Sequence, residues 1–166
     1  MKAALTGHRP KRLNLPYNVL DKEWKNLYSF IKETIINNNI TQVFCGMANG
    51  CDILIGIVAI DLKNEGYNIK LTCVLPCKGY GKKSEFFNIL RENADEWIEL
   101  NEKFYKGCDN IRDQYMVDNC DVLIAIFDGI EIGGVYATIK KAQKQNKKII
   151  YCSKELIKRI KLNIGR

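Results

Sequence analysis

Short apolar runs alternate along the chain with longer segments in which apolar residues recur every three or four positions. The runs are typical of buried β-strands, and the longer segments are typical of amphipathic helices. Strands are expected at residues 2–6, 42–45, 70–75, 97–100, 122–127 and 148–152. Helices are expected at residues 18–37, from the turn at 46–52 to about residue 64, at 84–94, 110–119 and 135–145, and from Ser153 onwards.

This alternation predicts the fold class. Strands separated by helices of ten or more residues form βαβ units, which make the sheet parallel and cover both of its faces. The helix at residues 53–60 is apolar nearly all round, so we expect it to be buried. We therefore expect an α/β protein, a Rossmann-like parallel sheet with helices on both faces in a three-layer αβα sandwich. Residues 1–166 are expected to form a single domain that ends in a basic helix at about 153–166.

Composition narrows the class of protein. A chain of 166 residues that is 46% hydrophobic is large enough for one buried core. Its longest apolar run, at residues 53–60, is much shorter than the roughly 18 residues that span a membrane. The seven cysteines are an odd number, so we do not expect a disulfide framework, and His8 is the only histidine, so we do not expect a metal site. With no recognisable signal peptide, we expect a cytoplasmic protein without membrane insertion.

Positive charge is concentrated towards the C-terminus. The chain carries 26 basic and 19 acidic residues, a formal net charge of +7. Residues 140–166 hold ten of the basic residues but only Glu155 among the acidic ones. Because the rest of the chain is close to neutral, charge does not mark the whole fold as a nucleic-acid binder. The amphipathic segment 156–162 is interpreted as a terminal helix with a solvated face, or as a contact for nucleic acid or an anionic membrane surface.

Candidate chemistry lies in three loops that follow predicted strands. They are the T-G-H-R turn at residues 6–9, the G-M-A-N-G-C-D loop at 46–52, and the segment from D-G at 128–129 to G-G at 133–134. Parallel strands end at one edge of their sheet, where such folds bind ligands. Glycine allows the backbone to approach a ligand, and a helix N-terminus directs free N–H groups at an anion. With His8 or Arg9 as a charged donor, the loops together predict a cradle for a phosphate-bearing ligand.

Each loop has a simpler interpretation when it is taken alone. A glycine after a strand also suits a tight turn, Asp52 also suits a helix N-cap, and Arg9 also suits a solvated surface. The phosphate-binding G-x-x-x-x-G-K-[ST] loop and the dinucleotide-binding G-x-G-x-x-G motif are both absent from the sequence. The predicted ligand site therefore depends on three loops meeting at one edge.

The same segments resemble those of a known family. The shared motifs are T-G-H-R-P at 6–10, G-M-A-N-G-C-D at 46–52, V-L-P at 74–76, R-D-Q-Y-M-V-D at 112–118, A-I-F-D-G at 125–129 and the glycine pair at 133–134. Over nearly its whole length, up to about residue 142, the chain resembles the YpsA-like family of the SLOG superfamily. That superfamily also contains the DNA-processing protein DprA (Smf) and the LOG phosphoribohydrolases.

The resemblance implies a Rossmann-like, SLOG-type domain with a pocket for a nucleotide or nucleotide-derived ligand, without a cofactor and without an assigned catalytic residue. The ligand-binding residues that it implies are Gly7, His8, Arg9, Gly46, Gly50, Asp52, Arg112, Gly133 and Gly134. A guanidinium suits Arg112 to phosphate, because its fork of donors matches the phosphate oxygens. The alternative for Arg112 is a surface residue at a helix start that pairs with Asp113 or Asp118.

The sequence departs from the pattern of the family in two places. The family usually has Gly-Gly-Thr where this chain has Val135 after the glycine pair, so one hydroxyl donor is missing. The phosphoribohydrolases carry P-G-G-x-G-T-x-x-E, and Lys140 stands where their glutamate acts in glycosidic cleavage. Glu131 is nearby but out of register. These departures weigh against nucleoside-monophosphate hydrolysis.

Three hypotheses follow for function. The leading one is a sensor or regulator that binds a nucleotide-derived ligand. The second is a hydrolase of an N-glycosidic or phosphoester bond in a nucleotide, with its acid or base supplied by Asp52, Asp128 or Glu131. The third is a DprA-like binder of single-stranded nucleic acid that uses the basic tail. The sheet edges and the aromatic segment around Trp97 also suggest a homo-oligomer.

Overall fold

The computed structural model describes residues 1–164, in which strands and helices alternate along the chain. The strands are β1 (Lys2–Gly7), β2 (Gln42–Cys45), β3 (Lys70–Leu75), β4 (Glu96–Glu99), β5 (Val122–Ile126) and β6 (Lys148–Tyr151). The α-helices are α1 (Pro10–Leu13), α2 (Lys25–Asn37), α3 (Cys51–Asn64), α4 (Phe87–Asn93), α5 (Cys108–Asn119), α6 (Gly134–Lys144) and α7 (Lys154–Lys161).

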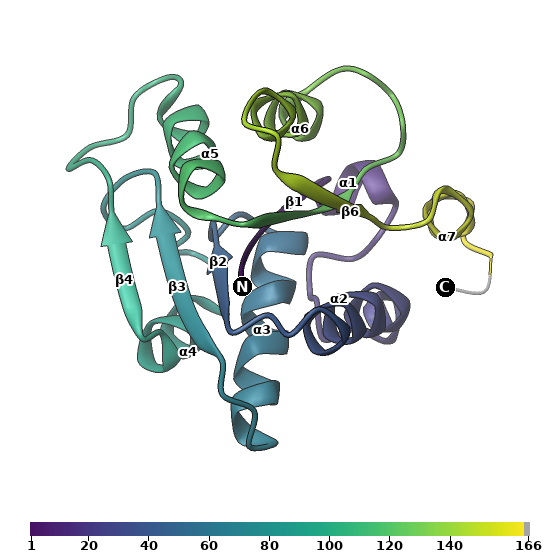
Figure 1. Ribbon diagram of the computed structural model, residues 1–166, viewed down its shortest axis with the longest axis horizontal. Coiled ribbons are helices and arrows are strands. Elements are labelled where there is room, and N and C mark those ends of the chain that lie inside the picture. Colours follow the sequence, from purple (N-terminus) through teal and green to yellow (C-terminus); the bar gives the residue numbers. More distant parts are fainter. Residues whose placement is uncertain (165–166) are drawn as a thin grey trace.

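All six strands are parallel and form one sheet in the order β4-β3-β2-β1-β5-β6 (Figure 1). β2, β3 and β4 add in turn to one side of β1, and β5 and β6 add to the other side. The order therefore reverses between β1 and β5, the place where ligands bind in open α/β sheets. The predicted fold class, a Rossmann-like parallel sheet, is confirmed.

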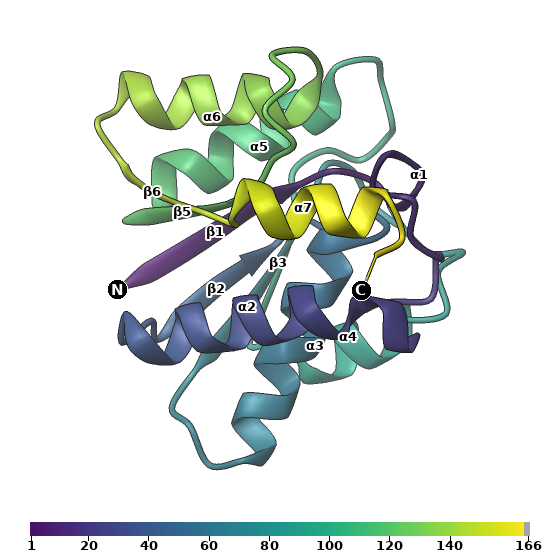
Figure 2. The same cartoon turned by 90° about the vertical axis from the view of Figure 1, so that its right-hand side faces the viewer.

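Helices cover both faces of the sheet (Figure 2). α5 and α6 lie on one face, and α2, α3, α4 and α7 lie on the other. Because successive strand residues point to opposite faces, Leu5 joins the core shared with α2 and α3, whereas its neighbour Ala4 joins the core shared with α5 and α6. This is the three-layer αβα sandwich that the sequence predicts.

The helix that follows the loop at residues 46–52 is buried, as its apolar sequence predicts. Every residue of α3 from 51 to 60 is buried. At Gly56 an added Cβ would lie 2.5 Å from Leu90, so the missing side chain is what lets α4 pack this close. The tight packing of α3 places its first turn rigidly at the carboxyl end of the sheet.

Two of the predicted helices begin elsewhere in the structure. A helix is expected from residue 18, but α2 begins only at residue 25. A turn of 3₁₀-helix at Lys22–Trp24 precedes it, and there the Asp21 carboxylate accepts the Glu23 N–H. Ser84, expected to be a helix N-cap, instead accepts the N–H of Phe86, and α4 begins one residue later. In both segments a local side-chain-to-backbone bond holds a turn that continues the apolar periodicity without being α-helix.

The basic C-terminal helix predicted for about residues 153–166 is present as α7, which ends at residue 161. The Ser153 hydroxyl caps it by accepting the Leu156 N–H, as expected. Ile157 and Ile160 are buried against the body, and α7 lies beside α2 (Figure 2). Residues 162–164 follow outside the helix, and the remaining two predicted positions lie outside the described residues. In the described part of the chain, no helix has the length and hydropathy to cross a membrane.

Candidate functional site

A pocket of about 290 Å³ lies at the carboxyl end of β1, beside the point where the strand order reverses. It is built by β1 and the turn after it, by the β2–α3 loop, and by the first turns of α3, α5 and α6. Its lining residues are Leu5, Thr6, Gly7, His8, Arg9, Arg12, Ala48, Asp52, Asp109, Arg112, Asp113, Gly134 and Val135. This volume is at the lower end of the range found for small-molecule sites, roughly 300–1,000 Å³.

The pocket brings together most of the residues predicted to bind the ligand. Six of them line it: Gly7, His8, Arg9, Asp52, Arg112 and Gly134. The other three are Gly46, Gly50 and Gly133, which support the walls without lining the pocket. The three predicted loops therefore meet at one edge of the sheet, while ligand contact by any of these residues stays a prediction.

The three supporting glycines are required by close packing or by backbone shape. A Cβ on Gly46 would lie 2.7 Å from the Asp52 carboxylate, behind the floor of the pocket. Gly50 has a φ of +94° and touches the proline that begins α1. Gly133 also has a φ of +94°, and an added Cβ would lie 3.2 Å from Nη1 of Arg12. Left-handed φ values of this kind favour glycine over any residue with a side chain.

Glycine also precedes each of the three helices that begin at the pocket. The N-cap residues of α3, α5 and α6 are Gly50, Gly107 and Gly133, and none of them supplies a side-chain cap. The first N–H groups of a helix have no partner within that helix, so they are left for other acceptors. α3 and α5 each carry an aspartate in the first turn, but α6 carries no acidic residue there. The positive end of α6 is therefore the one best suited to an anion from outside the protein.

Arg9 is the exposed cation of the pocket. Its side chain makes no hydrogen bond or ion pair with any of residues 1–164. Its backbone is nevertheless fixed, because its carbonyl accepts the N–H groups of Arg12 and Leu13 at the start of α1. Arg9 thus offers a free guanidinium from a fixed position.

Arg112 is buried rather than exposed, and the protein already uses much of its hydrogen-bonding capacity. Nη1 donates to the Gly46 carbonyl at 2.7 Å, and Nε donates to the Asp113 carboxylate at 2.9 Å. The ring of Tyr80 lies 5.7 Å from the guanidinium. Arg112 therefore joins α5 to the β2–α3 loop. It lines the pocket, as predicted, and it also pairs with Asp113, as the alternative interpretation predicts.

Two carboxylates share the charge of this arginine. Burial raises the pKa of Asp52 above its ordinary value, although the Arg112 charge opposes that rise. Burial likewise raises the pKa of Asp113 against the effect of the same guanidinium. For Arg112, burial lowers the pKa, but the neighbouring carboxylates more than compensate and raise it above the ordinary value. The floor of the pocket is thus an acid–arginine–acid cluster in which Asp52 and Arg112 are buried and Asp113 is partly exposed.

His8 lines the pocket from a buried position beside the loop that follows β5. Its Nε2 lies 3.1 Å from the backbone nitrogen of Asp128 and 3.1 Å from a carboxylate oxygen of the same residue. Burial lowers the pKa of His8 below its ordinary value even though the Asp128 charge raises it. In the neutral ring, an unprotonated Nε2 is the acceptor for the Asp128 N–H.

The structure adds lining residues that the sequence does not predict to bind the ligand, chiefly Arg12, Asp109 and Asp113. The two aspartates stand three positions before and one position after Arg112, so all three share one face of α5. That spacing was a usable signal. Arg12 follows Arg9 by one helical turn, but α1 is too short to show any periodicity in the sequence.

Two of the three candidate acid–base residues lie outside the pocket. Asp128 is buried at the loop after β5 and does not line the pocket. Burial alone would raise the pKa of Asp128, but hydrogen bonds from Arg12, the Ile130 N–H and Lys161 outweigh it and hold the pKa below the usual range. Glu131 is exposed and is not a lining residue. Of the three candidates, only Asp52 is in the pocket.

Among residues 1–164, no three His, Cys, Asp or Glu side chains are grouped to hold a metal ion. What the pocket offers is a free arginine, an uncapped helix end and several carboxylates. Such a set can bind an anionic group and accept hydrogen bonds from hydroxyl or amino groups.

Residues 3–159 match the YpsA family model, which is described as the YspA SLOG family. The match covers most of the chain, including every residue that lines the pocket. No curated protein that was compared matches the sequence.

Proposed function

The chain belongs to the YspA SLOG family, and we propose that it binds a nucleotide or nucleotide-derived ligand in this pocket as a sensor or regulator. The observation that carries the proposal is the pairing of Arg9 with the glycine-capped end of α6 in one pocket at the strand-order reversal. Free N–H groups at a helix N-terminus and an unpaired guanidinium are both donors for phosphate.

The remaining lining residues suit the sugar and base of a nucleotide. Asp52, Asp109 and Asp113 supply carboxylate oxygens on the side of the pocket formed by α3 and α5. Ribose hydroxyls and exocyclic amino groups donate hydrogen bonds to such acceptors, whereas inorganic anions have no such donors. The arrangement therefore favours a phosphate ester of a hydroxylated group over a simple anion. The seven buried, unpaired cysteines support the cytoplasmic location proposed with this function.

Thermal unfolding with a panel of nucleoside mono-, di- and triphosphates, ADP-ribose and cyclic nucleotides tests the proposal. A ligand at a hundredfold excess over its Kd adds about 2.7 kcal/mol of stability. For a chain of this size, that raises Tm by roughly 5–10 °C. A selective rise with one class of nucleotide supports the proposal, and no rise with any member of the panel rejects it.

Substitution of Arg9 locates the binding. Arg9→Ala removes one charge-assisted donor and is expected to weaken binding by roughly 10- to 100-fold without changing the Tm of the free protein. Lys11→Ala is the matched control, because Lys11 is an exposed cation two positions along the chain, in α1, and does not line the pocket. Equal weakening by both variants would indicate general charge attraction instead of a site.

A second function, nucleotide hydrolysis, is supported by Asp52. Its carboxyl lies in the pocket, and burial raises its pKa, which suits a group that gives up a proton during catalysis. Incubation with the same nucleotides, followed by chromatography of the products, tests this function. Turnover that is lost in Asp52→Asn, with ligand binding retained, would make the protein an enzyme.

A further inference from the structure

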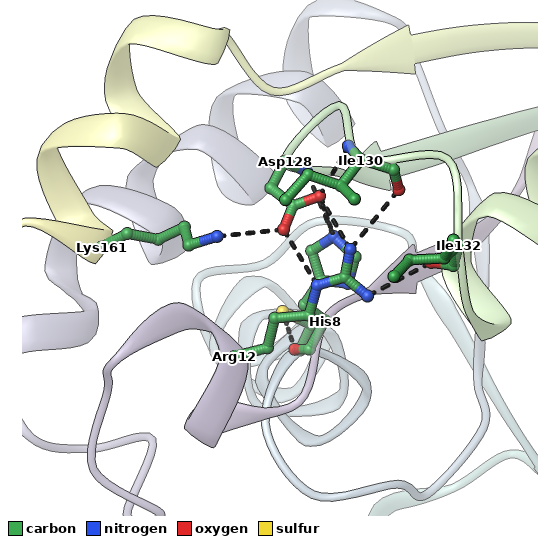
Figure 3. A network of polar contacts seen from close by, with 7 residues as sticks. His8, Arg12, Asp128, Ile130, Ile132 and Lys161 are labelled. Carbon is green, nitrogen blue, oxygen red and sulfur yellow. Dashed lines mark hydrogen bonds and ion pairs between the residues drawn. The ribbon is translucent and has the colours of Figure 1, made fainter.

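Arg12 lines the ligand pocket, and its guanidinium is held by the loop that follows β5 (Figure 3). Nε and Nη2 donate to the two oxygens of the Asp128 carboxylate at 2.9 and 3.0 Å. Nη2 also lies 3.4 Å from the Ile130 carbonyl, and Nη1 lies 3.3 Å from the Ile132 carbonyl. The Asp128 bonds set the plane of the guanidinium, because they engage one complete edge of its fork.

The free side of this fork lies next to the start of α6. A Cβ built on Gly133 would be 3.2 Å from Nη1, so this nitrogen is the one closest to the helix N-cap. Among the described residues, Nη1 makes only one hydrogen bond, the long one to the Ile132 carbonyl. Its second N–H is therefore available to a ligand. The Arg12 side chain is 29% exposed, so solvent or a ligand reaches it.

The carboxylate that holds Arg12 is itself enclosed. The Asp128 side chain is 3% exposed and also accepts the Ile130 N–H at 3.0 Å. A buried carboxylate with a strong bidentate partner stays ionised and keeps that partner in one orientation.

The C-terminal helix supplies the last contact. Nζ of Lys161 donates to the Asp128 carboxylate at 3.1 Å, and the Asn14 side chain donates to the Lys161 carbonyl at 3.3 Å. Asp128 and Lys161 border a separate depression beside α7, not the ligand pocket. Figure 3 shows Lys161 reaching the carboxylate from α7. One basic residue of the tail is therefore part of the support behind the site.

We propose that Arg12 is a phosphate-binding residue of the ligand site, and that Asp128 and Lys161 are positioning residues that orient its guanidinium towards the start of α6. The proposal rests on the proposed function and adds to Arg9 a second, oriented guanidinium that meets the phosphate. It also gives α7 a role in ligand binding that needs no contact between α7 and the ligand.

Among the pocket arginines, the geometry favours Arg12 as the oriented donor. Arg112 is buried between two carboxylates, and Arg9 is unrestrained by any side-chain partner among residues 1–164. Arg12 alone combines exposure to the pocket with a fixed plane beside a helix end that lacks a first-turn acid. A donor that is held in place loses less conformational entropy on binding.

The test compares AMP with adenosine, because their affinity ratio isolates the contribution of the phosphate. Arg12→Lys keeps a cation near Asp128 but lacks the fork, and should lower the AMP-to-adenosine affinity ratio about tenfold or more. Lys161→Met should lower that ratio about threefold by loosening Asp128. Lys158→Met is the matched control, since it removes a charge from an exposed residue of α7 and should leave the ratio unchanged. A purely structural role would weaken AMP and adenosine equally.

His8, the only histidine, reports on the network through its ring signals in NMR spectra. Because the Lys161 charge lowers the pKa of His8, Lys161→Met should raise that pKa while Lys158→Met should not. Titration with inorganic phosphate should shift the His8 signals in the parent, and the shift should be lost in Arg12→Lys.

The outcomes separate the two proposals. If Arg12→Lys keeps the parental AMP-to-adenosine ratio, the assignment of Arg12 is overturned while nucleotide binding stands. If the parent binds no nucleotide, the proposed function fails, and the phosphate titration decides about Arg12. A parental response to phosphate that disappears in Arg12→Lys then supports the assignment, and no response in the parent overturns it.

Discussion

Replacing Arg112 by methionine removes the buried cation that lies between two carboxylates, the buried Asp52 and the partly exposed Asp113. Arg112 is 4% exposed and donates to Asp113 and to the Gly46 carbonyl, and its charge also lowers the pKa of Asp52. Methionine fills a similar volume, so the main effect is loss of charge and of two hydrogen bonds. Removing one partner of a buried ion pair costs about 3–5 kcal/mol. We expect Arg112→Met to lose that much free energy of unfolding at pH 7.

Urea denaturation measures this loss directly. With an m-value of about 2 kcal/mol per molar urea, the midpoint should fall by about 1.5–2.5 M at constant m. Arg91→Met is the matched control: Arg91 is exposed on α4, stacks over Trp97 at 4.8 Å, and should cost less than about 1 kcal/mol.

The loss should also depend on pH in a defined direction. Without Arg112, the pKa values of Asp52 and Asp113 in the folded protein rise further above their values in the unfolded chain. A group with a raised folded pKa stabilises the fold below its unfolded pKa, near pH 4, and loses that effect as the pH rises through the folded value. The difference between variant and parent should therefore be small near pH 4 and full at pH 7. A loss below about 1 kcal/mol at pH 7, or one independent of pH, would refute the buried cluster as the reason.

Three further predictions concern other parts of the site. Gly50→Ala should lower the free energy of unfolding, measured by urea denaturation, by about 1–3 kcal/mol, because strain at a positive φ adds to a clash with the proline that begins α1. Gly66→Ala is the control, since Gly66 has a similar φ but no atom within 4 Å of an added Cβ and should show the strain alone. Equal losses in the two variants would rule out the clash. Stability should fall as the pH drops below about 6.5, because the unfolded chain protonates its histidine before the buried His8 does; an NMR titration that finds an unshifted pKa for His8 would contradict this. If the tail binds nucleic acid, Lys154→Glu with Lys158→Glu should abolish a salt-dependent affinity for single-stranded oligonucleotides without unfolding α7, and an unchanged affinity in filter binding would exclude the tail.

Local sequence patterns were sufficient for most of the fold. The apolar runs mark the inner strands because strands buried on both faces need continuous apolar residues. The two edge strands, β4 and β6, carry shorter apolar runs and are only partly buried. The start of α2 and the existence of α1 were not predicted, because a 3₁₀ turn and a four-residue helix carry too few residues for a period to show. The burial of α3 followed from its composition alone.

The site divides in the same way. The sequence alone predicted that the site lies at one edge of the sheet and includes the three glycine-containing loops and Arg9. This was possible because loops after parallel strands meet at one edge whatever side chains they carry. Which charged groups pair was decided by tertiary structure. Arg12 and Asp128 are 116 positions apart, and they meet only because β5 lies next to β1. Lys161 reaches the same carboxylate because α7 packs against α1, so a residue that the sequence places in a basic tail belongs to the support of the pocket. Side-chain pairing depends on distances between elements, which no local periodicity encodes.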